Sequence, residues 1–292
     1  MKYEAISRNS ARFPVKKMCE VFGLHVTNYY RWKQYQKKRE EKREKELGLV
    51  RLIEGVFLES DKTYGYRAIK KALEQKGTEI SEYKIRKIMR ENGFYPETRK
   101  KYKPYRKGKA DGKYYRNLIQ QNFKAERKNQ VWVGDITYLK TKLGWVYPAA
   151  VIDLYNREVI GYAVSKKIDT ELVKQALGNA IGRNGVEEGL IFHSDRGSQY
   201  ASRGYQKMLA EHGIKGSMSK PGCPYDNASM ESFFATLKKE RIYRREYVTM
   251  EEVKADMFRY IELFYNRKRL HSVLGYMSPV DYRLKYDGSK VA

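Results

Sequence analysis

The segment NQVWVGDITYLKT, residues 129–141, decides the fold class because its side chains alternate in character along the chain. In an extended strand Val133 and Asp135 point to one face, and Trp132 and Ile136 point to the other. Turn-forming residues then separate two more segments that are rich in β-branched and aromatic residues, GWVYPAAVIDLYN (144–156) and REVIGYAVS (157–165). The pattern predicts three antiparallel strands.

Helix and strand patterns alternate after these strands. TELVKQALGNAIGRNG (170–185) places apolar residues on one helical face, and GLIFHSD (189–195) has the pattern of a short buried strand. A helix is expected near 199–212, and the fragment GIKGSMS (213–219) follows it. Strands followed by alternating helix and strand predict an α/β fold with a mixed sheet.

The N-terminal half has helical patterns only, and it suggests small all-α modules. FPVKKMCEVFGLHVTNYYRWKQ contains two apolar helical stretches separated by Gly23, which is typical of a helix-turn-helix or of a simple helical hairpin. The run KKREEKREKE indicates a solvated connector helix. We predict five regions: 1–45, a helix-turn-helix with its connector; 46–97, a second helix-turn-helix module; 98–121, a basic linker; 122–285, the α/β core; and 286–292, a tail.

Charge indicates the kind of partner. The chain has 60 Lys and Arg residues against 35 Asp and Glu residues, a net charge of +25 at pH 7, which is typical of a protein that binds nucleic acid. Cations and tyrosines are concentrated in RKKYKPYRKGKADGKYYR, residues 99–116, which we expect to follow a phosphate backbone. The cations expected to contact DNA are Lys100, Lys101, Arg106 and Lys107 in the linker and Arg86 and Arg90 in the preceding helix.

Several classes of protein are excluded by composition. The longest uncharged apolar stretch, Trp145 to Ile152, is much shorter than the roughly 20 residues that cross a bilayer. The first residues lack the apolar block of a secretory signal, so we expect the chain in the cytoplasm. Cys19 and Cys223 are isolated, which excludes a disulfide scaffold and argues against a Cys/His zinc site.

Three carboxylates stand out by position. Asp135 lies inside the first predicted strand, where an unpartnered charge is costly, and Asp195 ends the strand of HSDRGSQY. Glu231 lies in the helix DNASMESFFATLKKE, and Lys238 is two turns further along the same face. Each acid alone is explained more simply as a turn former, a helix cap or a solvated residue. Together they have the chemistry of a magnesium or manganese site, in which two ions activate the attacking oxygen of a phosphoryl transfer and stabilise the leaving one.

These motifs resemble the DDE integrase core that bacterial insertion-sequence transposases share with retroviral integrases. The resemblance is carried by WVGDITYL, HSDRGSQY and DNASME, with thirty-five residues between Asp195 and Glu231. The segment FYNRKRLHSVLGYMSPVDY resembles the terminal signature YNxxRxHSxLGYxSP of one group of these transposases. TYGYRAIKKAL and SEYKIRKIMRENG resemble the helix-turn-helix block that precedes the core in that group.

The resemblance implies a ribonuclease H-like core in which Asp135, Asp195 and Glu231 are the catalytic residues and hold two Mg²⁺ or Mn²⁺ ions. It implies that the enzyme frees a 3′ hydroxyl at the end of an insertion sequence and joins it to target DNA. The further residues it assigns to DNA or to the loops around the site are Lys238, Asn227, Arg196, Arg269 and His271. His193 is interpreted as a packing residue, and Asp153, a possible fourth acid, as a structural one.

The implied partners are double-stranded DNA, namely the terminal inverted repeats and the target, and a second copy of the chain on that DNA. No membrane or small-molecule substrate is expected. Two other functions stay open: a catalytically idle DNA-binding regulator of transposition, and a structure-specific nuclease that cleaves without joining. A tyrosine recombinase is disfavoured because no cluster of Arg and His surrounds one Tyr.

Overall fold

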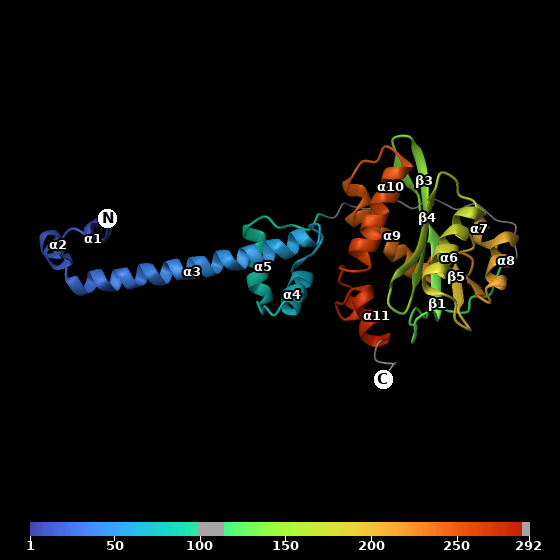
Figure 1. Cartoon of the computed structure of the whole chain (residues 1–292), viewed down its shortest axis with the longest axis horizontal. Coiled ribbons are helices and arrows are strands. Elements are labelled where there is room, and N and C mark those ends of the chain that lie inside the picture. Colours follow the sequence, from blue (N-terminus) through green and yellow to red (C-terminus); the bar gives the residue numbers. More distant parts are fainter. Residues whose placement is uncertain (98–113, 288–292) are drawn as a thin grey trace. The chain divides into compact units, whose positions relative to one another are not determined.

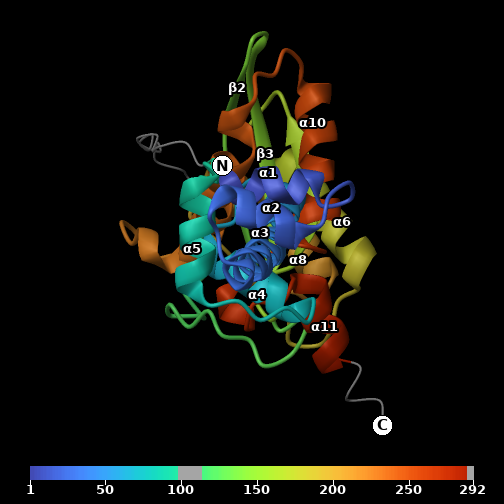
Figure 2. The same cartoon turned by 90° about the vertical axis from the view of Figure 1, so that its left-hand side faces the viewer.

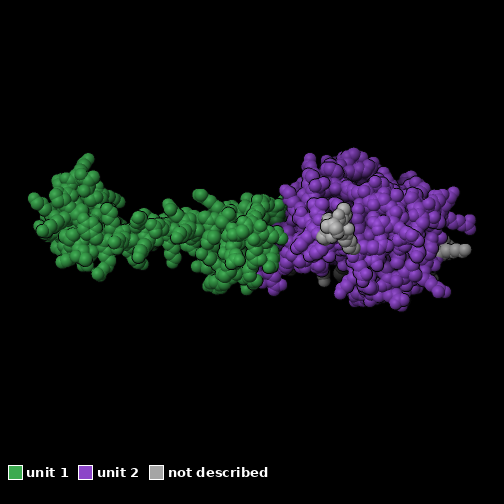
Figure 3. Space-filling model, turned by 60° about the horizontal axis from the view of Figure 1, so that its bottom comes forward, with its two compact units in different colours: residues 1–61, 69–95 green, residues 62–68, 96–292 purple. Residues whose placement is uncertain are grey.

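The computed structural model describes residues 1–97 and 114–287. Within the chain two compact units are distinguished (Figure 3), and each is described separately below. The helical unit consists of residues 1–61 and 69–95, and the catalytic unit consists of residues 62–68 and 96–292. The linker cations Lys100, Lys101, Arg106 and Lys107 lie outside the described residues.

The catalytic unit is built on one mixed sheet. Its central strand, β1 (Val131–Ile136), pairs antiparallel with β3 (Gly144–Asp153) and parallel with β5 (Ile191–Ser194). The remaining strands are β2 (Leu139–Thr141), β4 (Val159–Ser165) and β6 (Lys215–Met218). One edge of β3 pairs with β1 and then β2, its other edge pairs with β4, and β6 pairs parallel with β5. The predicted antiparallel strands are confirmed, although the first is divided into β1 and β2.

Helices cover both faces of this sheet (Figure 1). One face packs against α6 (Thr170–Asn184), α7 (Ser198–Ala201) and α8 (Arg203–Glu211), and the other against α9 (Ala228–Glu240) and α10 (Met250–Phe258). Alternation along β1 supplies both cores, since Trp132 is buried on the α6 side and Val133 on the α9 side. The close approach of α6 requires Gly161, where a Cβ would lie 2.3 Å from the Ala176 carbonyl oxygen. The prediction of an α/β fold is therefore confirmed.

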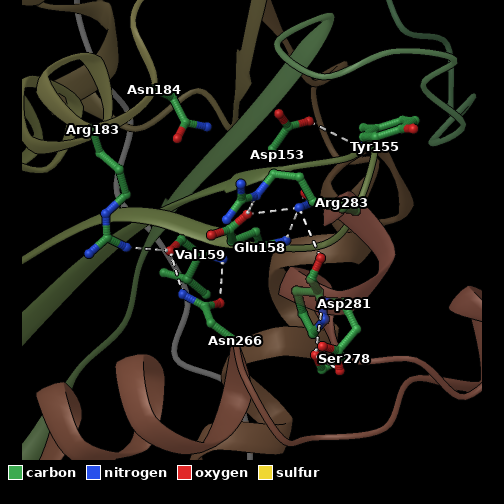
Figure 4. Close-up of polar contacts among 12 residues, drawn as sticks. Asp153, Tyr155, Glu158, Val159, Arg183, Asn184, Asn266, Ser278, Asp281 and Arg283 are labelled. Atoms are coloured by element: carbon green, nitrogen blue, oxygen red, sulfur yellow. Dashed lines mark hydrogen bonds and ion pairs between the residues drawn. The ribbon is translucent and has the colours of Figure 1, made fainter. Parts of the chain in front are cut away.

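The C-terminal segment of the catalytic unit packs along the outer strand β4. It contains the π-helical stretch η3 (Arg259–Tyr265) and the helix α11 (Pro279–Asp287). Three short 3-10 helices also belong to the unit: η1 (Pro224–Asn227), η2 (Ile242–Arg244) and η4 (Ser272–Leu274). Asn266 donates a hydrogen bond to the Val159 carbonyl (2.9 Å) and accepts one from the Val159 N–H (3.0 Å), as an added strand would (Figure 4). An ion pair between Glu158 and Arg283 (2.9 Å) holds α11 at the same edge. Figure 2 shows the β2–β3 hairpin at the opposite end of the sheet from α11.

The helical unit contains five helices, one of which is much longer than expected. They are α1 (Lys2–Asn9), α2 (Val15–Phe22), α3 (Val26–Glu59), α4 (Tyr66–Gln75), whose first turn is counted with the catalytic unit, and α5 (Glu82–Glu91). Gly23 ends α2 in a left-handed conformation (φ 67°), as the sequence pattern suggested. The Ser81 hydroxyl caps α5 by accepting from the Lys84 N–H (3.3 Å). The boundary predicted at residue 45 lies inside α3, because the charged run and the following apolar stripe form one continuous helix.

Candidate active site

Asp135 and Asp195 are brought together by two neighbouring parallel strands. Gly134 of β1 is paired with Ser194, the last residue of β5, and an aspartate follows each of them along the chain. Neighbouring strands are about 4.8 Å apart. Asp135 lies on the same face of β1 as Val133, which belongs to the core beneath α9. The register therefore sets the two aspartates at the same carboxyl edge of the sheet, with Asp135 on the side that α9 covers.

The backbone orients both carboxylates. Oδ1 of Asp135 accepts a hydrogen bond from the Ile136 N–H (2.8 Å), and Oδ1 of Asp195 accepts one from the Gly197 N–H (2.9 Å). Both aspartates are half-buried. The residue before Asp135 must be glycine for the ring of Phe192 to pack against β1, because a Cβ at Gly134 would lie 2.5 Å from that ring. The result is a pair of oriented, partly accessible carboxylates that are suited to a hard cation.

Helix α9 begins beside this edge. Asn227, at the start of α9, is buried and donates a hydrogen bond to the Gly134 carbonyl (3.4 Å), which holds the helix against the residue that precedes Asp135. Glu231 follows one turn later and is exposed. The apolar face of α9 packs into the core as predicted, through Met230, Phe233, Phe234 and Leu237. The structure gives Asn227 a positioning contact, not an exposed surface for DNA.

Lys238 lies close to Asp135. Its Nζ is 4.4 Å from the centroid of the Tyr138 ring, a cation–π contact. Burial lowers the pKa of Lys238 to about 8, and the negative charge of Asp135 opposes this change. Tyr138 was not singled out from the sequence, although it lies two residues after the strand that carries Asp135. The ammonium is thus held at the acidic site by an aromatic ring.

Arg196 joins the site to the end of the linker. Its Nε donates to the Ser219 carbonyl (2.8 Å), and its guanidinium lies 4.8 Å from the centroid of the Tyr114 ring. The next residue, Tyr115, packs over Gly216, where a Cβ would lie 2.3 Å from the tyrosine ring. Both tyrosines belong to the segment 99–116, which was expected to follow a phosphate backbone; in the structure their rings contact the protein. Arg196 therefore holds Tyr114 beside the loop that follows Asp195.

Asp226 fixes the loop before α9, a role that the sequence did not reveal. Its carboxylate accepts hydrogen bonds from the Lys220 N–H (2.7 Å) and from the side-chain amides of Asn117 (2.8 Å) and Gln121 (2.9 Å). Burial raises the pKa of Asp226, but these bonds outweigh burial and leave it below its ordinary value. The only signal in the sequence was an acid directly before Asn227.

His193 and Asp153 have structural environments, in agreement with their interpretation. His193 is fully buried, and its ring nitrogens contact the hydroxyls of Ser217 (2.8 Å) and Ser219 (3.3 Å). Burial lowers the pKa of His193 to about 4, so the ring is neutral at pH 7. Asp153 is fully buried at the end of β3 and accepts hydrogen bonds from the N–H groups of Asn129 (2.9 Å) and Tyr155 (3.0 Å), the second of which is visible in Figure 4. Burial raises the pKa of Asp153 to about 6.

Arg269 and His271 lie along a different face of α9 from Glu231. Arg269 forms a bidentate ion pair with Glu240, with Nη2 to Oε1 2.8 Å and Nε to Oε2 2.9 Å. Burial lowers the pKa of Arg269, but the hydrogen bonds and charge of Glu240 raise it above its ordinary value. His271 is buried behind Tyr265, whose ring centroid is 4.9 Å away. Neither residue was found beside the three acids.

The described residues contain neither a preformed metal cluster nor a membrane-spanning helix. Among residues 1–97 and 114–287, no group of three or more His, Cys, Asp or Glu residues is close enough to hold a metal ion. In the same ranges no helix is both long enough and apolar enough to cross a bilayer. In the helical unit, Arg86 and Arg90 are on the exposed side of α5, opposite its buried residues.

Comparison with known proteins identifies the family. Residues 125–224 and 231–286 match two models described as Integrase core domain, and residues 42–102 match an HTH-like domain. The transposase InsF for insertion sequence IS3A of Escherichia coli strain K12 is 36% identical over 285 residues, covering 98% of this chain and 99% of the relative. The chain belongs to the IS3 family of insertion-sequence transposases. The transposase for IS904 of Lactococcus lactis is 43% identical over 237 residues, 80% of this chain and 92% of the relative.

Solved integrases are also similar to this transposase. The catalytic core domain of BIV integrase has a TM-score of 0.43 at 19% identity, covering 56% of this chain and 99% of that one. The HTLV-2 integrase core in complex with magnesium has a TM-score of 0.42 at 16% identity, covering 53% and 95%. The mixed sheet and the matched family models establish an integrase-type, ribonuclease H-like core. The chain is accordingly an enzyme of the polynucleotidyl transferase class.

Proposed function

We propose that this transposase cuts at the terminal inverted repeats of its element and joins the freed 3′ ends to target DNA, with Asp135, Asp195 and Glu231 as metal ligands. The observation that supports the proposal is the parallel register of β1 and β5, after which an aspartate follows at the same edge of the sheet, Asp135 on the face that α9 covers. A pair of carboxylates borne by rigid strands is the arrangement that metal-assisted phosphoryl transfer requires.

The donors fit a divalent cation such as Mg²⁺ or Mn²⁺. Such ions prefer carboxylate oxygens and take the remaining ligands from water and from substrate phosphates, so two or three protein donors suffice. Asp135 and Asp195 supply donors from the sheet, and Glu231 supplies one from α9. Because the three acids do not form a closed cluster in the described residues, we propose that bound DNA and two cations complete the site.

Each residue has a defined task in this scheme. When bound, the two cations polarise the phosphodiester and activate the attacking water or 3′ hydroxyl. Asp135 and Asp195 hold their positions through the N–H groups of Ile136 and Gly197. Lys238 contributes a positive charge to the phosphate beside Asp135, and Asn227 keeps α9 in register with β1.

DNA is held more widely by cations outside the site. We propose that Lys100, Lys101, Arg106 and Lys107 follow the phosphate backbone and that Arg86 and Arg90 contact DNA from the HTH-like domain. Joining two ends of one element requires two active sites, so at least two copies act together on the DNA. We place this activity in the bacterial cytoplasm, on nucleoid DNA.

The test uses labelled duplexes that carry the ends of the element, incubated with Mg²⁺ or Mn²⁺ and either the wild-type chain or Glu231→Gln. We expect metal-dependent nicking and strand joining by the wild type, and binding without chemistry by the variant. Nicking without joining would indicate a structure-specific nuclease. Binding without chemistry in both proteins would indicate a regulator of transposition and would contradict the proposal.

A further inference from the structure

A second polar pocket lies on another face of α9, outside the acidic site. It has a volume of about 820 Å³ and is lined by the hydroxyl residues Ser229, Ser232 and Thr236 of α9 and by Arg157, Arg269 and His271. None of the described residues that line it is Asp or Glu. Its polar groups are thus guanidinium, imidazole and hydroxyl, which are the groups that proteins present to phosphate oxygens.

Among the described residues, no carboxylate neutralises the charge of Arg157. Nη1 donates to the Ser229 hydroxyl (2.8 Å), and Nη2 donates to the Phe123 carbonyl (3.1 Å). In the described part of the chain Arg157 forms no ion pair with a carboxylate, unlike Arg269, which Glu240 neutralises. Burial lowers the pKa of Arg157, which reflects the cost of keeping its charge there. An anion in the pocket would offset that cost.

His271 gives an independent indication of a ligand. It is 8% exposed, and its Nε2 is buried without a hydrogen-bond partner. Burial, together with the positive charges of Arg269 and Arg157, lowers the pKa of His271 to about 3, so the pocket has a positive field. A buried ring nitrogen without a partner is uncommon and calls for an explanation such as a missing ligand.

We propose that this pocket binds a backbone phosphate of the DNA substrate, through Arg157 and the hydroxyls of α9, while another phosphate of the same DNA lies at Glu231. The inference rests on the transposase function and adds a second anchoring point to it. The diameter of a helix with its side chains is about 10 Å, which corresponds to about three nucleotides along a strand at 3.4 Å each. A strand that crosses α9 can therefore reach both faces.

The experiment introduces a competing carboxylate into the pocket. Ser232 is exposed on the pocket wall, so Ser232→Glu adds a negative charge there, and Ser232→Gln adds the same volume without charge. Binding of the full-length chain to a random-sequence 30-bp duplex is measured against salt concentration in EDTA, so that no chemistry is needed. We expect the slope of log K against log salt to be smaller by about 0.9 for Ser232→Glu than for Ser232→Gln, the effect of one phosphate contact.

Controls separate the pocket from net charge and from folding. Gln175→Glu adds the same charge to an exposed position of α6, on the opposite face of the sheet, and should leave the slope unchanged. If Ser232→Glu does not fold, Thr236→Glu and Thr236→Gln, one turn further along α9, make the same comparison. Equal slopes for the Glu and Gln variants of a folded pair, or an equal loss in Gln175→Glu, would overturn the proposal.

A further measurement distinguishes DNA from a small anion. Thermal unfolding of the wild type and of Ser232→Glu is compared in inorganic phosphate and in chloride at the same ionic strength. If phosphate stabilises only the wild type while the DNA slopes of the Glu and Gln variants are equal, the pocket takes free phosphate and the proposed occupant is wrong. The outcome is independent of cleavage activity, so it can fail while the proposed function stands.

Discussion

The two polar faces of α9 differ in the sign of their charge and in what balances it. On one face Glu231 carries the acid that we propose to hold metal together with Asp135 and Asp195. Ser232 and Thr236 lie toward Arg157, a cation that we expect DNA to balance. On these proposals, one face of α9 offers the DNA backbone a site that needs bound metal ions, and another face offers it a cationic pocket. Each face would then be balanced by a ligand that binds from solution: metal ions at the first and DNA phosphate at the second.

The largest effect is expected at the acidic face. Asp135→Asn or Asp195→Asn removes a charged donor that the scheme requires for chemistry, and we expect cleavage to fall by about a thousandfold or more, equivalent to about 4 kcal/mol. The measurement is single-turnover cleavage of labelled element ends. The matched control is Asp153→Asn, an acid on the same sheet that caps a turn, which should retain most activity. Similar losses in all three variants would indicate a structural role instead.

The next prediction concerns the linker cations, whose attraction for DNA is separate from that of the Arg157 pocket. Replacing Lys100, Lys101, Arg106 and Lys107 together by Ala should flatten the salt dependence of DNA binding by as much as about 3.6 in slope, or about 0.9 for each lost phosphate contact. Titrations of one duplex across salt concentrations would measure it. An unchanged slope would show that these cations do not contact phosphates. The phosphate contacts expected of this protein would then be those beside α9.

A third change tests Arg269, the pocket cation that Glu240 neutralises. Glu240→Gln leaves the guanidinium of Arg269 buried without its counter-charge, and we expect a loss of about 3 kcal/mol in the free energy of unfolding. Urea unfolding would measure this loss. Glu251→Gln, at an exposed position in the first turn of α10, is the control and should change stability by less than about 0.5 kcal/mol. Equal stability of the two variants would mean that solvent already compensates Arg269.

The smallest effect is expected for one cation on the acidic face. Lys238→Gln should lower the salt slope of DNA binding by about 0.9, because it removes one phosphate contact. The neighbouring Lys239, which is exposed on α9, provides the control as Lys239→Gln. If the two variants change the slope equally, Lys238 makes no phosphate contact beyond that of any exposed lysine, and its contact with Tyr138 serves packing only.

The sequence was sufficient for the sheet and for the location of the aspartates. Alternation around Asp135 and the short strand before Asp195 are local signals, and parallel pairing of two such strands brings their carboxyl ends together. The continuity of α3 could not be predicted, because its charged middle has no apolar periodicity and contains Gly48. Local patterns identify an element but do not show whether it continues into the next one.

The second pocket could not be predicted for a different reason. Arg157 and Ser229 are 72 positions apart, and no local pattern links a residue in the β3–β4 turn with the first turn of α9. Arg269 and His271 were identified as a motif, but their partners Glu240 and Tyr265 depend on the path of the C-terminal segment. Long-range packing decides whether an arginine is neutralised, and that information is absent from the spacing.

The middle of α3 has a consequence for local unfolding. Residues 41–48 are all exposed, so these two turns are stabilised by helix propensity and charge pairing without tertiary burial, whereas Ile53 and Phe57 near the end of the helix are buried. Helices without packing are marginal in water. Backbone amides of residues 41–48 should therefore exchange with deuterium far sooner than those near Ile53. Local opening there would let α1 and α2 move while the rest of the protein stays folded.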